Sequence, residues 1–162
     1  MTRTTHDMVL TRDLDASVDE VWNAWTQADM VKRWWGPAGF TAPVAEMDVR
    51  VGGTSLVCMR APAEFGGGDM YKTWTYTIVE PTTRLEFVQR FSDENRNPLD
   101  PASLGLPAGI PSEVPHVLTF RALDDGRTEL TVTESGYTDP EVVEISRGGM
   151  GQCLDKLAAI LA

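Results

Sequence analysis

The sequence VKRWWGPAGF, residues 31–40, places two tryptophans side by side immediately before a Gly-Pro pair. Neighbouring side chains on a helix point to different faces, so Trp34 and Trp35 cannot pack into the same surface. Asp29 is a suitable cap for a short helix that runs to Trp35, and the Gly-Pro pair ends this helix because proline cannot continue it. Met30 and Trp34 share one face. This spacing predicts that Trp34 packs the helix on a sheet and that Trp35 turns toward a cavity mouth.

The residues before this stretch predict a strand followed by a first short helix. Residues 8–14 have the apolar content of a strand. Ser17, with Glu20 three positions later, forms a capping-box pattern. Apolar side chains at helical spacing then predict an amphipathic helix over residues 18–27.

From residue 42 the apolar pattern changes to a period of two, which is typical of half-buried strands. Turns rich in Gly, Pro and Asp separate the candidates, and such short connections join antiparallel neighbours. The predicted strands are residues 42–50, 54–61, 69–80, 84–91, 115–123 and 127–136. Within the first of these, Glu46, Asp48 and Arg50 are expected to share one face.

A long helix is predicted from Pro140 to the C-terminus, where apolar residues form a single stripe. Gly148, Gly149 and Gly151 interrupt its middle and predict a kink or a close approach by the sheet or a ligand. One long helix against a curved antiparallel sheet of about seven strands gives an α+β two-layer fold, with two short helices after the first strand. The sequence shows no repeat or linker, so residues 1–162 are expected to form a single domain.

Composition excludes several kinds of partner. The net charge of −10 disfavours nucleic acids and anionic membranes, because both require basic patches. No apolar run reaches the length of a membrane span, and the N-terminus lacks the apolar core of a signal peptide. Cys58 and Cys153 have no metal-like spacing, and a reducing cytoplasm fits them best. No motif for a metal, a nucleophile or a phosphate cradle is present, so no cofactor is expected.

Four segments together resemble a known family. They are LDAS at 14–17, VWNAWTQADMVKRWWGP at 21–37, EMDVRVGGTSLVCMR at 46–60 and LDKLAAIL at 154–161. In this order they resemble the family named after the activator of Hsp90 ATPase, within the Bet v 1/START-like (SRPBCC) superfamily. The resemblance implies a seven-stranded sheet that grips the C-terminal helix over a hydrophobic cavity. It implies no single activity, because relatives include polyketide cyclases, lipid carriers, ligand-sequestering resistance proteins and the co-chaperone domain.

Side-chain alternation predicts the wall of this cavity. The expected apolar lining consists of Trp35, Trp74, Tyr76, Phe87, Leu118, Phe120, Val132, Met150 and Leu154. Relatives often carry Trp near position 150, so the resemblance implies a larger or more adaptable cavity here. Lys72 alternates onto the same face and is expected to pack along the wall with its ammonium near the rim.

The turn at 124–126 sets a register that places His116 opposite Glu134, with Gln89 toward the same end of the sheet. These three polar residues are expected to orient the polar end of a ligand. A histidine beside a carboxylate can also act as a general acid or base, which makes His116 and Glu134 the candidate catalytic residues. A purely structural hydrogen-bonded network is the third interpretation.

The segment 92–114 is too long for a hairpin turn and is expected to act as a lid. The leading hypothesis is binding of a small hydrophobic or aromatic ligand for transport, sequestration or sensing. A cyclase- or hydratase-like enzyme without a cofactor is the alternative. A co-chaperone-like interaction module is a lesser one, since nothing resembles a second, chaperone-docking domain. A homodimer paired through sheet edges or loops is compatible with the sequence.

Overall fold

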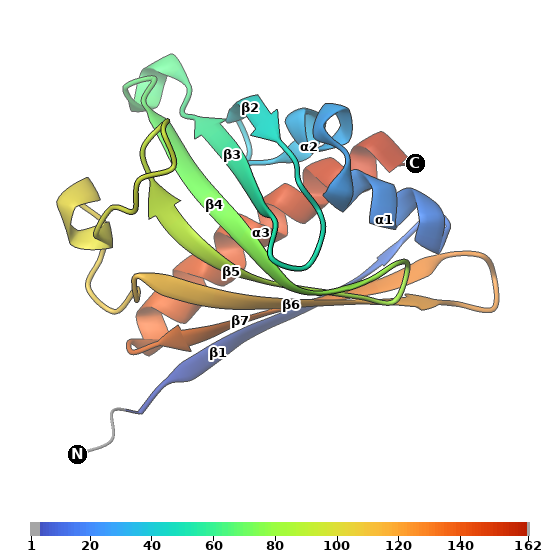
Figure 1. Cartoon of the computed structure of the whole chain (residues 1–162). Helices are drawn as coiled ribbons and strands as arrows, with labels where there is room; N and C mark the ends of the chain where they lie inside the picture. The colour runs from blue at the N-terminus through green and yellow to red at the C-terminus, as the bar shows by residue number, and fades with distance from the viewer. Residues whose placement is uncertain (1–3, 162) are drawn as a thin grey trace.

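The structure, a computed structural model, describes residues 4–161 and contains one curved sheet and three α-helices in that range (Figure 1). The strands are β1 (His6–Leu14), β2 (Thr41–Glu46), β3 (Thr54–Arg60), β4 (Asp69–Glu80), β5 (Arg84–Ser92), β6 (Glu113–Ala122) and β7 (Thr128–Tyr137). The helices are α1 (Val18–Thr26), α2 (Ala28–Trp34) and α3 (Pro140–Leu161), with short 3-10 helices η1 (Ala63–Phe65) and η2 (Pro101–Leu104).

The seven strands form one sheet in the order β1-β7-β6-β5-β4-β3-β2, and every neighbouring pair is antiparallel. The sheet bends around α3, which runs along its concave side, while α1 and α2 connect β1 to the opposite edge strand β2 (Figure 1). This arrangement confirms the predicted α+β helix-grip fold. The core lies between the two layers.

The two short helices begin as their sequences dictate, with one difference. The capping box at the start of α1 is confirmed, because Ser17 Oγ accepts from the Glu20 N–H at 3.2 Å. The predicted cap of α2 at Asp29 is wrong: Gln27 takes this position, and Asp29 lies in the first helical turn. Since Gln27 alone separates the helices, it serves as both the C-cap of α1 and the N-cap of α2.

The adjacent tryptophans separate at the end of α2. Trp34 is fully buried, and its Nε1 donates to the Ala24 carbonyl at 2.8 Å. Its ring packs edge-on against that of Trp25, with centroids 4.6 Å apart, so the Trp34 side chain holds α2 against α1. Trp35 lies beyond the last helical residue and packs edge-on against Trp74 of β4 at 5.0 Å. The two rings still meet edge-on, with centroids 5.7 Å apart, so both belong to one aromatic cluster, and Trp35 in addition contacts β4.

The strand β2 ends at Glu46, earlier than the predicted 42–50, because the chain turns tightly after it. Arg50 Nε donates to Asp48 Oδ1 at 2.9 Å within this turn. A Cβ added at Gly53 would lie 2.4 Å from the Asp48 carbonyl oxygen, so the turn closes only around a glycine. The expectation that Glu46, Asp48 and Arg50 share one strand face is therefore wrong.

The helix α3 runs without interruption through its three central glycines. A Cβ added at Gly148 or Gly149 would have no neighbouring heavy atom within 4 Å, while one at Gly151 would lie 3.4 Å from Arg12 Nη2. The side of α3 that carries Gly148 and Gly149 therefore faces open space. The helix continues through the glycine-rich segment without a break.

Candidate functional site

A cavity of about 420 Å³ lies between the concave face of the sheet and the middle of α3. Most of its lining side chains are apolar. They come from β3 to β7, α3, the segment after α2 and the loop between β5 and β6: Trp35, Pro37, Phe40, Met59, Met70, Lys72, Gln89, Phe91, Leu106, Ile110, Val114, Glu134, Tyr137, Val142, Ile145, Ser146, Gly149, Met150 and Cys153. Pockets of a few hundred Å³ with mostly apolar walls are typical of sites for small organic molecules.

A second, more open hollow of about 650 Å³ adjoins the first and shares Phe40, Met59 and Met70 with it. Its remaining wall includes exposed side chains such as Phe65, which is 71% accessible. The cavity beside α3 is the better candidate site, because the buried side chains of Gln89 and Glu134 both face its apolar space.

Three of the predicted ligand-binding residues, Trp35, Gln89 and Met150, line the cavity beside α3. The structure places the others in the packed core outside it: Trp74, Tyr76, Phe87, Leu118, Phe120, Val132 and Leu154. Tryptophans from α1 fill this half of the concave face, with Trp25 6.0 Å from Trp74 and Trp22 5.3 Å from Phe120 between ring centroids. The remaining space is thus confined to the other half.

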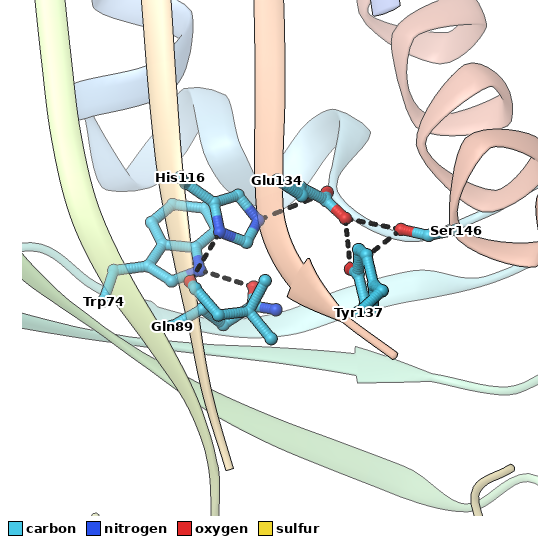
Figure 2. Close-up of polar contacts among 7 residues, drawn as sticks. Trp74, Gln89, His116, Glu134, Tyr137 and Ser146 are labelled. Carbon is cyan, nitrogen blue, oxygen red and sulfur yellow. Dashed lines mark hydrogen bonds and ion pairs between the residues drawn. The ribbon is translucent and has the colours of Figure 1, made fainter. Parts of the chain in front are cut away.

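The predicted register between β6 and β7 is confirmed, since His116 lies opposite Glu134 and Leu118 opposite Val132. His116 Nε2 is 3.2 Å from Glu134 Oε2 (Figure 2). Glu134 lines the cavity, whereas His116 lies behind it, stacked on the Phe87 ring at 4.8 Å. Both side chains are more than nine-tenths buried.

Glu134 is surrounded by donors. The Tyr137 hydroxyl donates to Glu134 Oε1 at 2.5 Å, and the Ser146 hydroxyl of α3 donates to the same oxygen (Figure 2). Burial by itself raises the pKa of Glu134, but the charge of His116 and these hydrogen bonds outweigh it and lower the pKa to about 2. Glu134 is therefore a carboxylate at neutral pH, with its oxygens already engaged.

Both ring nitrogens of His116 face oxygen acceptors. Nδ1 donates to the Val114 carbonyl at 2.9 Å, and Nε2 faces the Glu134 carboxylate at an angle that makes the contact an ion pair without an aligned hydrogen bond. Both contacts turn the ring nitrogens toward protein oxygens, and His116 does not line the cavity.

Gln89 lines the cavity and is also hydrogen-bonded to the aromatic core. Its Oε1 accepts from Trp74 Nε1 at 3.0 Å (Figure 2). This bond occupies the acceptor end of the amide and leaves its nitrogen as the free polar group of a cavity-lining side chain.

Lys72 lines the cavity, on the face of β4 that side-chain alternation predicts. Its Nζ is 5.6 Å from the Trp35 ring centroid and 5.4 Å from that of Phe91, and both rings belong to the cavity wall. Burial lowers the pKa of Lys72, and the nearby Glu134 carboxylate opposes this effect only in part. Strand alternation identified the correct face of β4, but the depth of Lys72 depends on the chain that covers it.

That cover is the loop between β5 and β6, which supplies Leu106 and Ile110 to the cavity wall. Backbone bonds hold the loop at both ends: Leu99 N–H donates to the Phe91 carbonyl at 2.9 Å, and Thr138 N–H donates to the Gly109 carbonyl at 3.0 Å. Sequence reasoning missed the two lining residues because the loop has no periodicity that distinguishes an inward side.

Within the range 4–161, no group of three or more His, Cys, Asp or Glu side chains is arranged to hold a metal ion. Over the same residues, no helix is both long and apolar enough to cross a membrane.

A curved seven-stranded sheet that grips a long C-terminal helix defines a protein of the Bet v 1/START-like, or SRPBCC, class. The family described as "Activator of Hsp90 ATPase homolog 1-like protein" matches residues 15–162, and the chain belongs to this family. A comparison with curated proteins gave no match.

Solved structures support this placement. A Chromobacterium violaceum protein is 27% identical, with a TM-score of 0.77 and 96% of each chain covered. A protein from Arthrobacter aurescens is 26% identical, with a TM-score of 0.76 over 96% of this chain and 85% of the other. A Mycobacterium smegmatis protein shares the fold, with 24% identity and a TM-score of 0.75 over 96% of this chain and 90% of its own.

Proposed function

We propose that this protein binds a small, mainly apolar molecule in the cavity between the sheet and α3. The observation that carries the proposal is the mainly apolar cavity of about 420 Å³, into which a few polar side chains converge. Trp35 and Met150 would contact the apolar part of the ligand, and Gln89 and Glu134 its polar end. Carriage, sequestration or sensing in a reducing cytoplasm fits such a site, as both cysteines are free and buried.

An acid/base role for His116 and Glu134 has weaker support. The two side chains are in contact, but His116 does not line the cavity and both of its nitrogens are engaged. Glu134, with a pKa of about 2, is a weak base. A homodimer and a chaperone partner stay predictions for which the contacts of this chain offer no specific support.

The binding proposal is tested with N-phenyl-1-naphthylamine, an uncharged aromatic probe that fluoresces in apolar surroundings. We expect saturable binding to the wild-type protein. Gly149→Leu should weaken binding about tenfold or more, because Gly149 lines the cavity and a side chain there enters open space.

Gly148→Leu is the matched control, since Gly148 has the same helical environment but is exposed and outside the lining. It should bind the probe as the wild type does. Absence of probe binding, or equal weakening by both substitutions, would contradict the proposal.

A further inference from the structure

The titratable groups that line the cavity are Lys72, Glu134, Tyr137 and Cys153. Burial raises the pKa of the Tyr137 hydroxyl above its ordinary value and that of the Cys153 thiol to about 11, so both are neutral at physiological pH. Glu134 contacts His116 and accepts from two hydroxyl donors. Lys72 is the basic group of this lining, and no hydrogen bond or ion pair within residues 4–161 engages its ammonium.

Lys72 is unlike the other two lysines of the chain. Lys32 is exposed on α2, and Lys156 donates to the Gly36 and Phe40 carbonyls at 3.0 and 2.9 Å. Within the part of the chain that the structure describes, Lys72 Nζ forms no hydrogen bond or ion pair and lies beside two aromatic rings. A partly buried ammonium with no acceptor is costly, because it has lost water and gained no equivalent hydrogen bond.

The other free polar groups of the cavity are also donors. Trp35 Nε1 is buried and has no hydrogen-bond partner among residues 4–161, and it belongs to the ring beside which the Lys72 ammonium lies. The Gln89 amide nitrogen is left over once Trp74 has bonded to the oxygen. Of the Glu134 oxygens, Oε1 already accepts two hydrogen bonds, and Oε2 faces His116 Nε2 at 3.2 Å. The donor groups of Lys72, Trp35 and Gln89 have no acceptor among residues 4–161, so the cavity is suited to a ligand that accepts.

We propose that the ligand is an amphipathic anion, whose single carboxylate or sulfonate group binds Lys72 and Trp35 Nε1 while its apolar body fills the cavity. This inference rests on the proposed binding function and specifies its ligand class. Binding forms a charge-assisted hydrogen bond inside an apolar site and removes two unsatisfied donors at once. A cationic ligand is disfavoured, because it would face Lys72 and find the Glu134 carboxylate already in contact with His116 and two hydroxyl donors.

The test compares two probes with the same aromatic skeleton. 8-Anilinonaphthalene-1-sulfonate carries one negative charge, and N-phenyl-1-naphthylamine lacks it. We expect the wild-type protein to bind the anion about tenfold more tightly. Lys72→Met should weaken anion binding about 10- to 100-fold and change binding of the neutral probe by no more than about twofold.

Lys32→Met removes the same charge from an exposed position and should leave both affinities unchanged. Trp35→Phe keeps an aromatic ring but removes the indole donor, and should weaken anion binding about 3- to 10-fold. This second variant keeps the inference testable if Lys72→Met fails to fold.

The outcomes separate the two proposals. If the wild type binds neither probe, the apolar binding function fails and this inference falls with it. If the neutral probe binds but the Lys72 and Trp35 substitutions leave anion affinity unchanged, the anion site is wrong while the binding cavity stands.

Discussion

At the scale of single residues, Trp34 and Trp35 show how neighbours in sequence serve separate purposes. The Trp34 indole is fully buried and donates a hydrogen bond to the Ala24 carbonyl, which connects α2 to α1. Trp35, one position later, contributes its ring to the cavity and leaves its nitrogen unbonded within the described chain. Substitution of Trp34 should therefore affect folding, whereas that of Trp35 should affect binding.

Glu134 gives a pH-dependent contribution to stability. Its folded-state pKa of about 2 lies below the ordinary value of 4.5, so the stabilisation is complete above about pH 4.5 and is lost as the pH falls toward 2. Glu134→Gln removes this contribution, on the order of 3 kcal/mol. We expect urea unfolding to show the largest difference between variant and wild type at pH 7, and a shrinking difference between pH 4.5 and 2.

Glu129→Gln is the control on the same strand, because Glu129 forms an exposed ion pair with Arg121. Such pairs add little to stability, so this variant should follow the wild type closely at every pH. A Glu134→Gln difference that stays constant from pH 7 to pH 2 would show that Glu134 is not a stabilised carboxylate.

At the scale of elements, the loop between β5 and β6 combines a fixed backbone with an apolar inner surface. Leu106 and Ile110 face the cavity, while Leu104 on η2 is 38% exposed and outside its lining. The loop also packs against the start of α3, where a Cβ on Gly109 would lie 2.8 Å from the Asp139 Cβ. The loop therefore forms part of the wall that a bound ligand would contact.

The double substitution Leu106→Ala and Ile110→Ala is expected to open this cover. Release of N-phenyl-1-naphthylamine, measured by stopped-flow displacement, should become roughly tenfold faster, since changes to a binding wall act mainly on dissociation. Leu104→Ala should release the probe at the wild-type rate. Equal rates in all three proteins would show that the loop does not limit release.

At the scale of the whole molecule, side chains fill only part of the space between the sheet and α3. Tryptophans of α1 and of the α2 end pack the half of the concave face near Trp74 and Phe120. The other half, between β4, β5, β7 and the middle of α3, retains the cavity. A ligand there would contact both layers and the covering loop, so its binding is linked to folding of the entire domain.

This linkage predicts a dependence of thermal stability on probe concentration. Because the cavity exists only in the folded chain, each tenfold increase of free N-phenyl-1-naphthylamine above its Kd should add about 1.4 kcal/mol to the free energy of unfolding. Thermal denaturation of the wild type should show Tm rising with probe. Gly149→Leu, with its cavity obstructed, should show a smaller rise over the same concentrations, and identical curves would contradict a site beside α3.

Local signals in the sequence predicted most of the fold. The capping box at Ser17, the period of two after residue 42 and the turn at 124–126 each depend on neighbouring residues. The register that joins His116 to Glu134 follows from that turn alone. The predicted end of β2 was wrong because the chain turns so tightly that Gly53 lies against the Asp48 carbonyl. Side-chain periodicity does not encode this close backbone contact.

The sequence by itself determined the order of the elements, the faces of the strands and the family of the protein. Only the tertiary structure decided which half of the concave face stays empty, how deep Lys72 lies and which hydroxyls surround Glu134. The physical reason is one of range: caps, turns and alternation are set by residues near one another in the chain. The cavity is the volume left after tryptophans, a loop and a distant helix have packed together, and that volume depends on all of them at once.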